Sequence, residues 1–312
     1  MRTLSLLLAA FLPLSLASGQ EPSPPAKPRR PLPKEPIPLT DAPVQTREVT
    51  YKTTPQGELN LHFYLPPHWD PKKDQRPAMV FFFGGGWRSG SYRQFISQAA
   101  YFASRGLVCA SADYRVSSIH KTTPDACVAD AKSAVRWLRQ HAADFGIDPQ
   151  RIIAAGGSAG GHLAAATALV PGFDEPGEDT AISCVPNAMV LFNPALDLTL
   201  VVDREILGAD GGNIAPAISP TRFLTSKAPP AILFFGTADT LAPHGTGYLR
   251  RAVEVGADAE LWTAADEAHG FFNHQPWLEA TTRKADEFLT RLGYLDGLPT
   301  LPETTVHLDR AP

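Results

Sequence analysis

The stretch RIIAAGGSAGG, at residues 151–161, decides the fold. Residues 151–155 are mostly apolar and predict a short buried strand. The glycines that follow surround Ser158 and lead directly into an expected helix. A serine with glycines two residues before and two residues after it suits a sharp turn from strand to helix, because larger side chains there would collide with neighbouring backbone. We therefore expect Ser158 above the carboxyl edge of a sheet, with the helix N-terminus directed at it.

Apolar runs rich in β-formers alternate with helical patterns from residue 44 onward, which indicates a mostly parallel sheet covered by helices on both faces. Residues 47–53 and 59–65 flank the turn Pro55-Gln56-Gly57 and predict an antiparallel hairpin. Residues 197–227 are irregular, and we interpret them as a small insertion over the site. The other strands are expected at residues 78–83, 107–113, 151–155, 188–192, 231–235 and 259–263, and helices at residues 95–103, 125–142, 245–255 and 277–292.

A second glycine-rich stretch, Phe83-Gly84-Gly85-Gly86-Trp87, follows one of the expected strands. Backbone without side chains can direct its N–H groups into a site, as an oxyanion hole requires. We expect the N–H groups of Gly85, Gly86 and Ala159 to bind the negative oxygen of a tetrahedral intermediate. Trp87 is a candidate wall for the substrate, although an aromatic residue after such a loop is as often part of the core. No G-K-[ST] follows, which disfavours a phosphate-binding loop.

The acid that orients a catalytic histidine is expected at the end of a later strand. Asp239 ends the stretch Phe235-Gly236-Thr237-Ala238-Asp239, which continues directly from the apolar run at residues 231–235. Asp197, four residues after Asn193 at the end of the preceding strand, is the rival, and a turn or helix cap is its structural alternative. We favour Asp239, because its lead-in is shorter and it keeps the chain order Ser, Asp, His.

Nine histidines compete for the role of general base. Only His269 lies in a loop after the last expected strand, 30 residues beyond the candidate acid (269 − 239 = 30). His162 and His244 are interpreted as solvated or packing residues, and His274 is the fallback. In the expected reaction His269 accepts the proton of the attacking serine, and water activated by the same histidine clears the acyl-enzyme.

The sequence resembles the hormone-sensitive-lipase-like and acetyl-esterase branch of the α/β-hydrolases over residues 51–292. Four motifs carry the resemblance: GGGW at residues 84–87, DYR at 113–115, GGSAGG at 156–161 and HGF at 269–271. The resemblance implies an α/β-hydrolase fold with a mainly parallel eight-stranded sheet, a cap, no cofactor and hydrolysis of short acyl esters. It carries the triad onto Ser158, Asp239 and His269. The family pattern usually begins H-G-G-G, whereas Phe83 stands first here. The histidine of the family shapes the oxyanion loop and does not react, so this difference affects the expected shape of the loop and not the chemistry.

Two other functions use the same fold. A peptidase of the prolyl-oligopeptidase kind would use the same triad, but it normally carries a propeller domain for which this chain has no room. A binding protein on a hydrolase fold that has lost turnover would normally lack a triad residue or the oxyanion glycines, all of which are present here. By analogy with bacterial esterases, the natural ester is expected to carry acetyl or feruloyl groups on plant polysaccharide.

The N-terminal residues differ in composition from the rest of the chain. Arg2, the apolar residues 4–16 and the small residues Ala17-Ser18-Gly19 follow the pattern of an export signal. Residues 20–43 are rich in proline and predict an extended linker. We therefore expect a secreted or periplasmic protein with a signal peptide at residues 1–19, this linker, a catalytic domain at 44–295 and a polar tail at 296–312.

The charge and hydrophobicity of the chain disfavour nucleic acid and membranes as partners. The net charge is −4 and the isoelectric point about 6.1, and no run of like charges forms a nucleic-acid or membrane patch. No stretch after the signal is apolar for long enough to cross a membrane. A small or polysaccharide-linked ester is the expected partner, and the oligomeric state is left open. The three cysteines lack metal-site spacing, and the pairing of Cys127 with Cys184 stays open.

Overall fold

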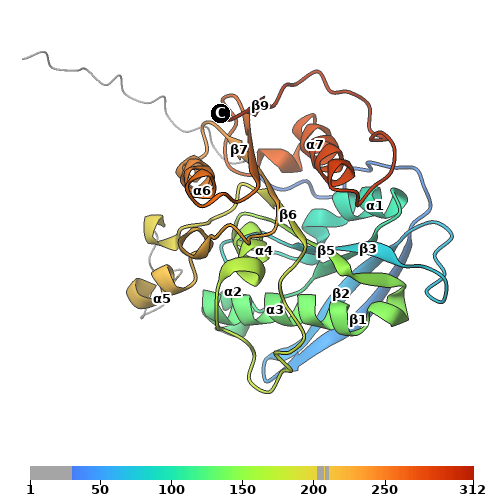
Figure 1. Ribbon diagram of the computed structural model, residues 1–312, viewed down its shortest axis with the longest axis horizontal. Coiled ribbons are helices and arrows are strands. Elements are labelled where there is room, and N and C mark those ends of the chain that lie inside the picture. The colour runs from blue at the N-terminus through green and yellow to red at the C-terminus, as the bar shows by residue number, and fades with distance from the viewer. Residues whose placement is uncertain (1–29, 202–206, 208–210) are drawn as a thin grey trace, which may run out of the picture.

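The computed structural model describes residues 30–201, 207 and 211–312. The predicted signal peptide, residues 1–19, and residues 20–29 of the predicted linker lie outside the described residues. In the described part, nine strands form one sheet (Figure 1). They are β1 (Gln45–Thr54), β2 (Gly57–Leu65), β3 (Arg76–Phe82), β4 (Val108–Ala112), β5 (Ile147–Gly157), β6 (Ala188–Phe192), β7 (Ala231–Gly236), β8 (Ala259–Ala264) and β9 (Asp309–Arg310).

The strand order is β1-β2-β4-β3-β5-β6-β7-β8-β9. The predicted hairpin of β1 and β2 pairs antiparallel, β2 pairs antiparallel with β4, and the strands from β4 to β8 are parallel. The prediction of eight strands was one short. The additional strand, β9, comes from the tail and pairs antiparallel with Trp262 and Thr263 of β8. It spans only two residues, so it leaves no hydrophobic pattern that a sequence can show.

Helices cover both faces of the sheet, as predicted (Figure 1). α1 (Ile96–Ser104) and α7 (Trp277–Arg291) pack on one face with Phe81 of β3 and Phe192 of β6. α3 (Pro124–Gln140), α4 (Ala159–Leu169) and α6 (Ala242–Val255) pack on the other face. α3 begins at Pro124, whose fixed φ and missing N–H suit the first turn of a helix. The helices are α1 (Ile96–Ser104), α2 (Ser117–His120), α3 (Pro124–Gln140), α4 (Ala159–Leu169), α5 (Gly211–Ala217), α6 (Ala242–Val255) and α7 (Trp277–Arg291).

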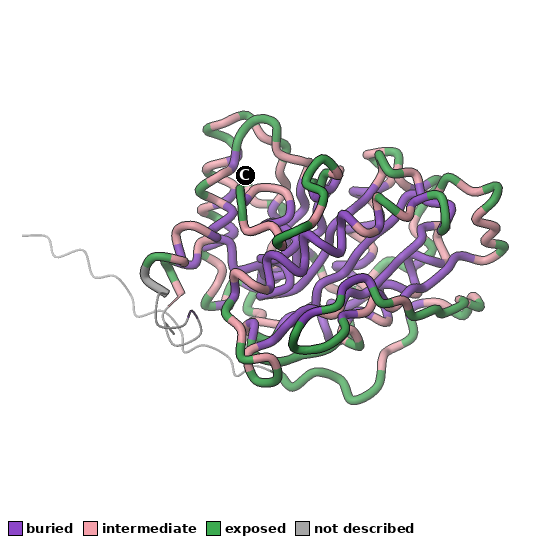
Figure 2. Tube along the Cα trace, turned by 90° about the horizontal axis from the view of Figure 1, so that it is seen from below, coloured by how far each residue is buried: buried purple, intermediate pink, exposed green. Residues whose placement is uncertain are grey.

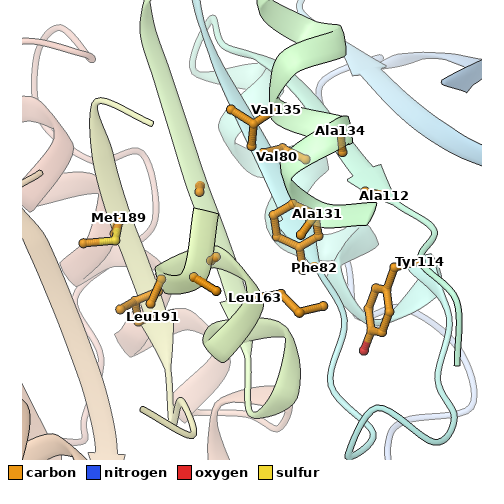
Figure 3. Packing of buried hydrophobic residues seen from close by; sticks show 14 of the residues in the cluster. Val80, Phe82, Ala112, Tyr114, Ala131, Ala134, Val135, Leu163, Met189 and Leu191 are labelled. Carbon is orange, nitrogen blue, oxygen red and sulfur yellow. The ribbon is translucent and has the colours of Figure 1, made fainter. Parts of the chain in front are cut away.

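The core follows the central strands, and exposed residues lie at the outer loops (Figure 2). Val80 and Phe82 of β3 meet Ala131 and Val135 of α3 on one face (Figure 3). All four side chains are buried, and burying a Val or Phe side chain contributes about 1.5–3 kcal/mol to stability. The short alanine side chains of α3 bring this helix close to the sheet, which fixes the scaffold beneath the site.

Among its described residues, the predicted insertion at residues 197–227 contains α5 and two 3₁₀ helices, Leu198–Leu200 and Pro220–Phe223. Cys127 and Cys184, whose pairing the sequence left open, are buried free thiols. No helix within the described ranges combines the length and hydrophobicity needed to span a bilayer.

The described end of the predicted linker, residues 30–43, contains no helix or strand but packs on the folded domain. Leu39 is buried, and Ile37 packs against the cluster under α1 and α7. Prolines prevent this segment from pairing with a strand, yet they leave an extended chain free to bury its apolar side chains. Residues 30–43 of the predicted linker therefore pack against the catalytic domain.

Candidate active site

Ser158 lies in the sharp turn between β5 and α4, with φ 55° and ψ −118°. A Cβ atom on Gly160 would lie 2.0 Å from the carbonyl oxygen of Phe82, and one on Gly156 would lie 2.7 Å from the same oxygen. Gly160 is therefore required by close approach of β3, and Gly156 by close approach of both β3 and the backbone of Gly160, as the sequence pattern indicates. The N–H of Ser158 donates to the carbonyl of Phe192 at 2.9 Å, which holds the turn against β6.

The structure brings Ser158, His269 and Asp239 together. Oγ of Ser158 lies 2.8 Å from Nε2 of His269, and Nδ1 of His269 lies 2.8 Å from Oδ2 of Asp239. Asp239 follows β7 and is 4% exposed, and its other oxygen accepts the N–H of Leu241 at 2.8 Å. A carboxylate accepts hydrogen bonds only, so Nδ1 carries the imidazole proton and Nε2 is free to accept the serine hydroxyl proton.

The rival acid, Asp197, has a structural task. Its Oδ1 accepts the backbone N–H of Thr199 at 3.0 Å and caps the 3₁₀ helix that follows β6. His244 is buried next to it, and Nδ1 of His244 accepts the N–H groups of Leu196 and Asp197. Burial lowers the pKa of His244, because the charged imidazolium is poorly solvated there. These two residues shape the turn after β6.

His162 is a packing residue of α4. Its Nδ1 accepts the indole N–H of Trp87 at 3.2 Å, and its Nε2 lies 2.7 Å from the carbonyl oxygen of Ile218. Burial lowers the pKa of His162 to about 4, so the ring is neutral at pH 7. The fallback base, His274, makes no hydrogen bond with Ser158, which bonds to His269 instead.

The oxyanion loop, residues 83–87, turns through left-handed backbone at Gly85 (φ 127°) and Gly86 (φ 63°). The carbonyl of Gly85 accepts the N–H groups of Arg88 and Ser89, which folds the loop back on itself. Among described residues, the N–H groups of Gly85 and Gly86 have no hydrogen-bond acceptor. Ala159 is the first residue of α4, where an N–H has no partner within the helix.

The DYR motif supports this loop from behind. The hydroxyl of Tyr114 donates to the carbonyl of Phe83 at 2.7 Å, and the two rings stack with centroids 4.1 Å apart. Arg115 forms a buried ion pair with Asp130 of α3 at 2.7 Å. Phe83, which replaces the histidine usual at this position, is therefore held by an aromatic stack.

Ser158 and His269 open into a cavity of about 700 Å³. Trp87 lines it, although the indole N–H of Trp87 is directed into the core toward His162. Leu200 and Val201 of the predicted insertion form part of the wall, and so do Arg30 and Leu32 of the predicted linker. In the described part of the chain, no three His, Cys, Asp or Glu side chains are grouped as a metal site requires.

Three amide side chains at the site were not predicted as functional. Asn193 follows β6 and is fully buried, and its Oδ1 accepts the N–H of Gly270 at 3.0 Å. Gln94 and Asn273 line the cavity and bond to each other. A polar residue shortly after an apolar strand, the signal that marked Asp239, also marks Asn193. Gln94 and Asn273 lie in short 3₁₀ helices and carry no such signal.

A family model with the description BD-FAE matches residues 61–249, which is more than half of the chain. The chain belongs to the BD-FAE family. It is 29% identical to esterase LipQ of Mycobacterium tuberculosis over 81% of this chain and 62% of LipQ. It is 28% identical to carboxylesterase NlhH of the same species over 69% of this chain and 72% of NlhH. The predicted esterase family is thereby confirmed.

A solved structure similar to this BD-FAE chain is the apo form of Thermogutta terrifontis esterase 2. The two are 45% identical with a TM-score of 0.76, over 81% of this chain and 96% of the other. The α/β-hydrolase fold is confirmed by this match. The same esterase has been solved with propionate bound, with butyrate bound and phosphorylated by paraoxon.

Proposed function

We propose that this protein is a serine carboxylesterase that hydrolyses short-chain acyl esters through Ser158, His269 and Asp239. The observation that carries the proposal is the unbroken path of 2.8 Å contacts from the serine hydroxyl through the imidazole to a buried carboxylate. The path ends in a cavity beside the glycine-rich loop, where the N–H groups of Gly85 and Gly86 bond to no acceptor among the described residues. Propionate and butyrate bound to the Thermogutta terrifontis esterase support a short acyl group.

In the first half of the proposed reaction, Oγ of Ser158 attacks the acyl carbon and Nε2 of His269 takes its proton. The carbonyl oxygen becomes negative and is bound by the N–H groups of Gly85, Gly86 and Ala159. The tetrahedral intermediate collapses, the C–O bond to the alcohol breaks, and the imidazolium protonates the leaving alcohol. Asp239 stabilises the imidazolium and keeps the ring in its orientation.

In the second half, a water molecule takes the place of the alcohol. His269 removes a proton from this water, which attacks the acyl-enzyme and regenerates the same oxyanion. Collapse breaks the acyl–Oγ bond, the imidazolium returns its proton to Ser158, and the carboxylic acid leaves. Each preorganised oxyanion donor contributes roughly 10²–10³-fold to the rate in comparable hydrolases.

The natural alcohol is proposed to be a polysaccharide that carries acetyl or feruloyl groups. A cavity of about 700 Å³ lies within the range of sites for small organic molecules and leaves room for an aromatic acyl group. Export of the protein, proposed from the pattern of residues 1–19, would bring it to such polymers. Fractionation of the producing cells, with detection of the protein outside the cytoplasm, tests export independently of activity.

The test of the proposed activity uses the chain from Gln20 onward, because residues 30–43 contribute to the cavity. Hydrolysis of 4-nitrophenyl acetate, butyrate and octanoate is measured beside a Ser158→Ala variant. We expect rapid release from the two shorter esters and loss of release in the variant. Absence of release from every ester in the intact protein would overturn the proposal. Acetylated and feruloylated xylan then decide between the two acyl groups.

A further inference from the structure

Two side-chain amides join the oxyanion loop to the loop that carries His269. The N–H of Gly84 donates to Oε1 of Gln94 at 2.6 Å, and Nε2 of Gln94 donates to Oδ1 of Asn273 at 3.1 Å. Nδ2 of Asn273 in turn donates to the carbonyl of Gly270 at 2.9 Å. An unbroken path of hydrogen bonds therefore connects the loop of the proposed oxyanion donors with the loop of the proposed base.

The two ends of this path fix the orientation of both amides. Gly84 presents an N–H, so Gln94 must turn its oxygen toward it. Gly270 presents a carbonyl, so Asn273 must turn its nitrogen toward it. Turning either amide over would place two donors or two acceptors against each other. Asn273 is 7% exposed, so water cannot readily replace a lost partner there.

Gly84 is also fixed from the side of the nucleophile. A Cβ atom on Gly84 would lie 2.9 Å from the carbonyl oxygen of Gly157 and 3.3 Å from Cβ of Ser158. The backbone of Gly84 is thus held between the nucleophile turn and the amide of Gln94. Because Gly85 and Gly86 follow directly, a displacement of Gly84 would move the proposed oxyanion donors away from the serine.

The histidine loop is held in a similar way. Gly270 bonds to Asn273 through its carbonyl and to Oδ1 of Asn193 through its N–H. Nδ2 of Asn193 lies 3.4 Å from Nε2 of His269. Gly270, the residue next to the proposed base, is therefore held between two buried amides, that of Asn193 after β6 and that of Asn273 in the 3₁₀ helix Phe271–Asn273.

We propose that Gln94 and Asn273 are positioning residues that keep the oxyanion loop and the histidine loop at a fixed separation. The role rests on the proposed function, since it serves a reaction in which both loops act on the same tetrahedral intermediate. Both residues act through the backbone of Gly84 and Gly270. Their contribution is therefore expected in the transition state and not in the binding of the ground-state ester.

The first test is Gln94→Leu, which removes both hydrogen bonds at similar side-chain size. We expect kcat for 4-nitrophenyl acetate to fall roughly 10- to 100-fold, which is less than the loss of a whole oxyanion donor, while KM changes by less than about 3-fold. The affinity for a trifluoromethyl ketone, which forms a tetrahedral adduct with the serine, should fall by the same factor as kcat/KM. The control is Gln98→Leu, because the buried amide of Gln98 bonds to none of the described residues.

The second test is the pH profile of Gln94→Glu. A protonated glutamic acid has a carbonyl for Gly84 and an O–H for Asn273, so it reproduces both contacts of the amide. The ionised carboxylate lacks the donor and places negative charge beside the oxyanion. The ratio of kcat/KM between Gln94→Glu and wild type should therefore rise as the pH falls from 8 to 5. A purely structural role of Gln94 predicts a constant ratio.

The possible results distinguish failure of the proposed esterase function from failure of the positioning role. If the wild-type protein hydrolyses no ester, the proposed function and the positioning role are both overturned. If wild type is active and Gln94→Leu keeps its kcat per active site and its ketone affinity, the positioning role alone is overturned. The same holds if the only change is a lower unfolding temperature. A parallel loss of kcat/KM and ketone affinity, absent in Gln98→Leu, supports it.

Discussion

At the scale of single residues, two aspartates that follow neighbouring strands differ in what they contact. Asp239 meets Nδ1 of His269 at 2.8 Å, whereas Asp197 caps a 3₁₀ helix. An ionised Asp239 keeps the proton of His269 on Nδ1 and leaves Nε2 unprotonated toward Ser158. An amide in its place can donate as well as accept, so it no longer selects this tautomer.

Asp239→Asn is therefore expected to lower kcat for 4-nitrophenyl butyrate by roughly 10³–10⁴-fold with little change in KM, by comparison with a triad aspartate replaced in another hydrolase. Steady-state kinetics at pH 7.5 check this result. Asp197→Asn is the matched control, because the amide oxygen can still cap the 3₁₀ helix, and its kcat should stay near that of wild type. A large loss in the Asp197 variant instead would show that the acid is misassigned.

His162 makes stability depend on pH. Its pKa is about 4 in the folded protein and 6.5 for an ordinary histidine, so between these values the unfolded chain binds a proton that the folded chain does not. The contribution of the neutral His162 ring to the free energy of unfolding is fully present above pH 6.5 and is lost as the pH falls toward 4. The shift of 6.5 − 4 = 2.5 corresponds to about 3 kcal/mol at 1.36 kcal/mol per unit.

Urea unfolding of wild type and His162→Gln at pH 7, 5.5 and 4.5 measures this contribution. A glutamine has a donor and an acceptor for the same two partners but does not titrate in this range. We expect the free energy of unfolding to fall more steeply with acidification in wild type than in the variant. Equal slopes would mean that His162 is already charged in the folded protein or is accessible to water.

The residues of the site differ in how far the sequence reveals them. Ser158 and His269 lie in motifs, Asp239 follows an apolar run, and each comes after a strand, so their meeting at one sheet edge follows from the topology. Gln94 and Asn273 belong to short 3₁₀ helices far apart in the chain. Their contact depends on how two loops fold over the sheet edge, and no periodic pattern encodes it.

At the scale of elements, the segment at residues 30–43 has a larger part than its composition suggests. Proline-rich sequence predicts an extended chain, and residues 30–43 contain neither helix nor strand. A few apolar side chains decide whether such a chain packs against the domain. Here Leu39 and Ile37 pack against the domain core, and Leu32 lines the cavity. Burial of Leu39 contributes about 1.5–3 kcal/mol, enough to hold the segment in place.

Removal of the residues before Val44 should therefore open one wall of the cavity. Because the proposed triad remains, we expect kcat for 4-nitrophenyl acetate to stay within about 3-fold of the value for the intact protein. KM for the butyrate ester should rise about 5-fold, because roughly 1 kcal/mol of apolar contact with the substrate is lost. Leu32→Ala should reproduce part of the rise in KM. Leu298→Ala, at a leucine that is 86% exposed and outside the cavity, is the control. If KM for the butyrate ester is unchanged in both the shortened protein and Leu32→Ala, residues 30–43 do not contribute to substrate binding.

At the scale of the whole molecule, the order of strands determines which residues can meet. β5, β6, β7 and β8 are adjacent and parallel, so Ser158, Asn193, Asp239 and His269 all emerge at one edge of the sheet. This much follows from the alternation of strands and helices in the sequence. The ninth strand and the packing of residues 30–43 and of the tail do not, because they rest on a few contacts between segments without periodic patterns.

The central claim is that Ser158 is the nucleophile, and covalent labelling tests it most directly. The protein is incubated with paraoxon, which phosphorylates the Thermogutta terrifontis esterase, and intact and peptide masses are recorded as activity falls. We predict one diethyl phosphate group per chain, located on Ser158, with activity lost in proportion to labelling. Labelling of another residue, or full activity in a completely labelled protein, would contradict the account.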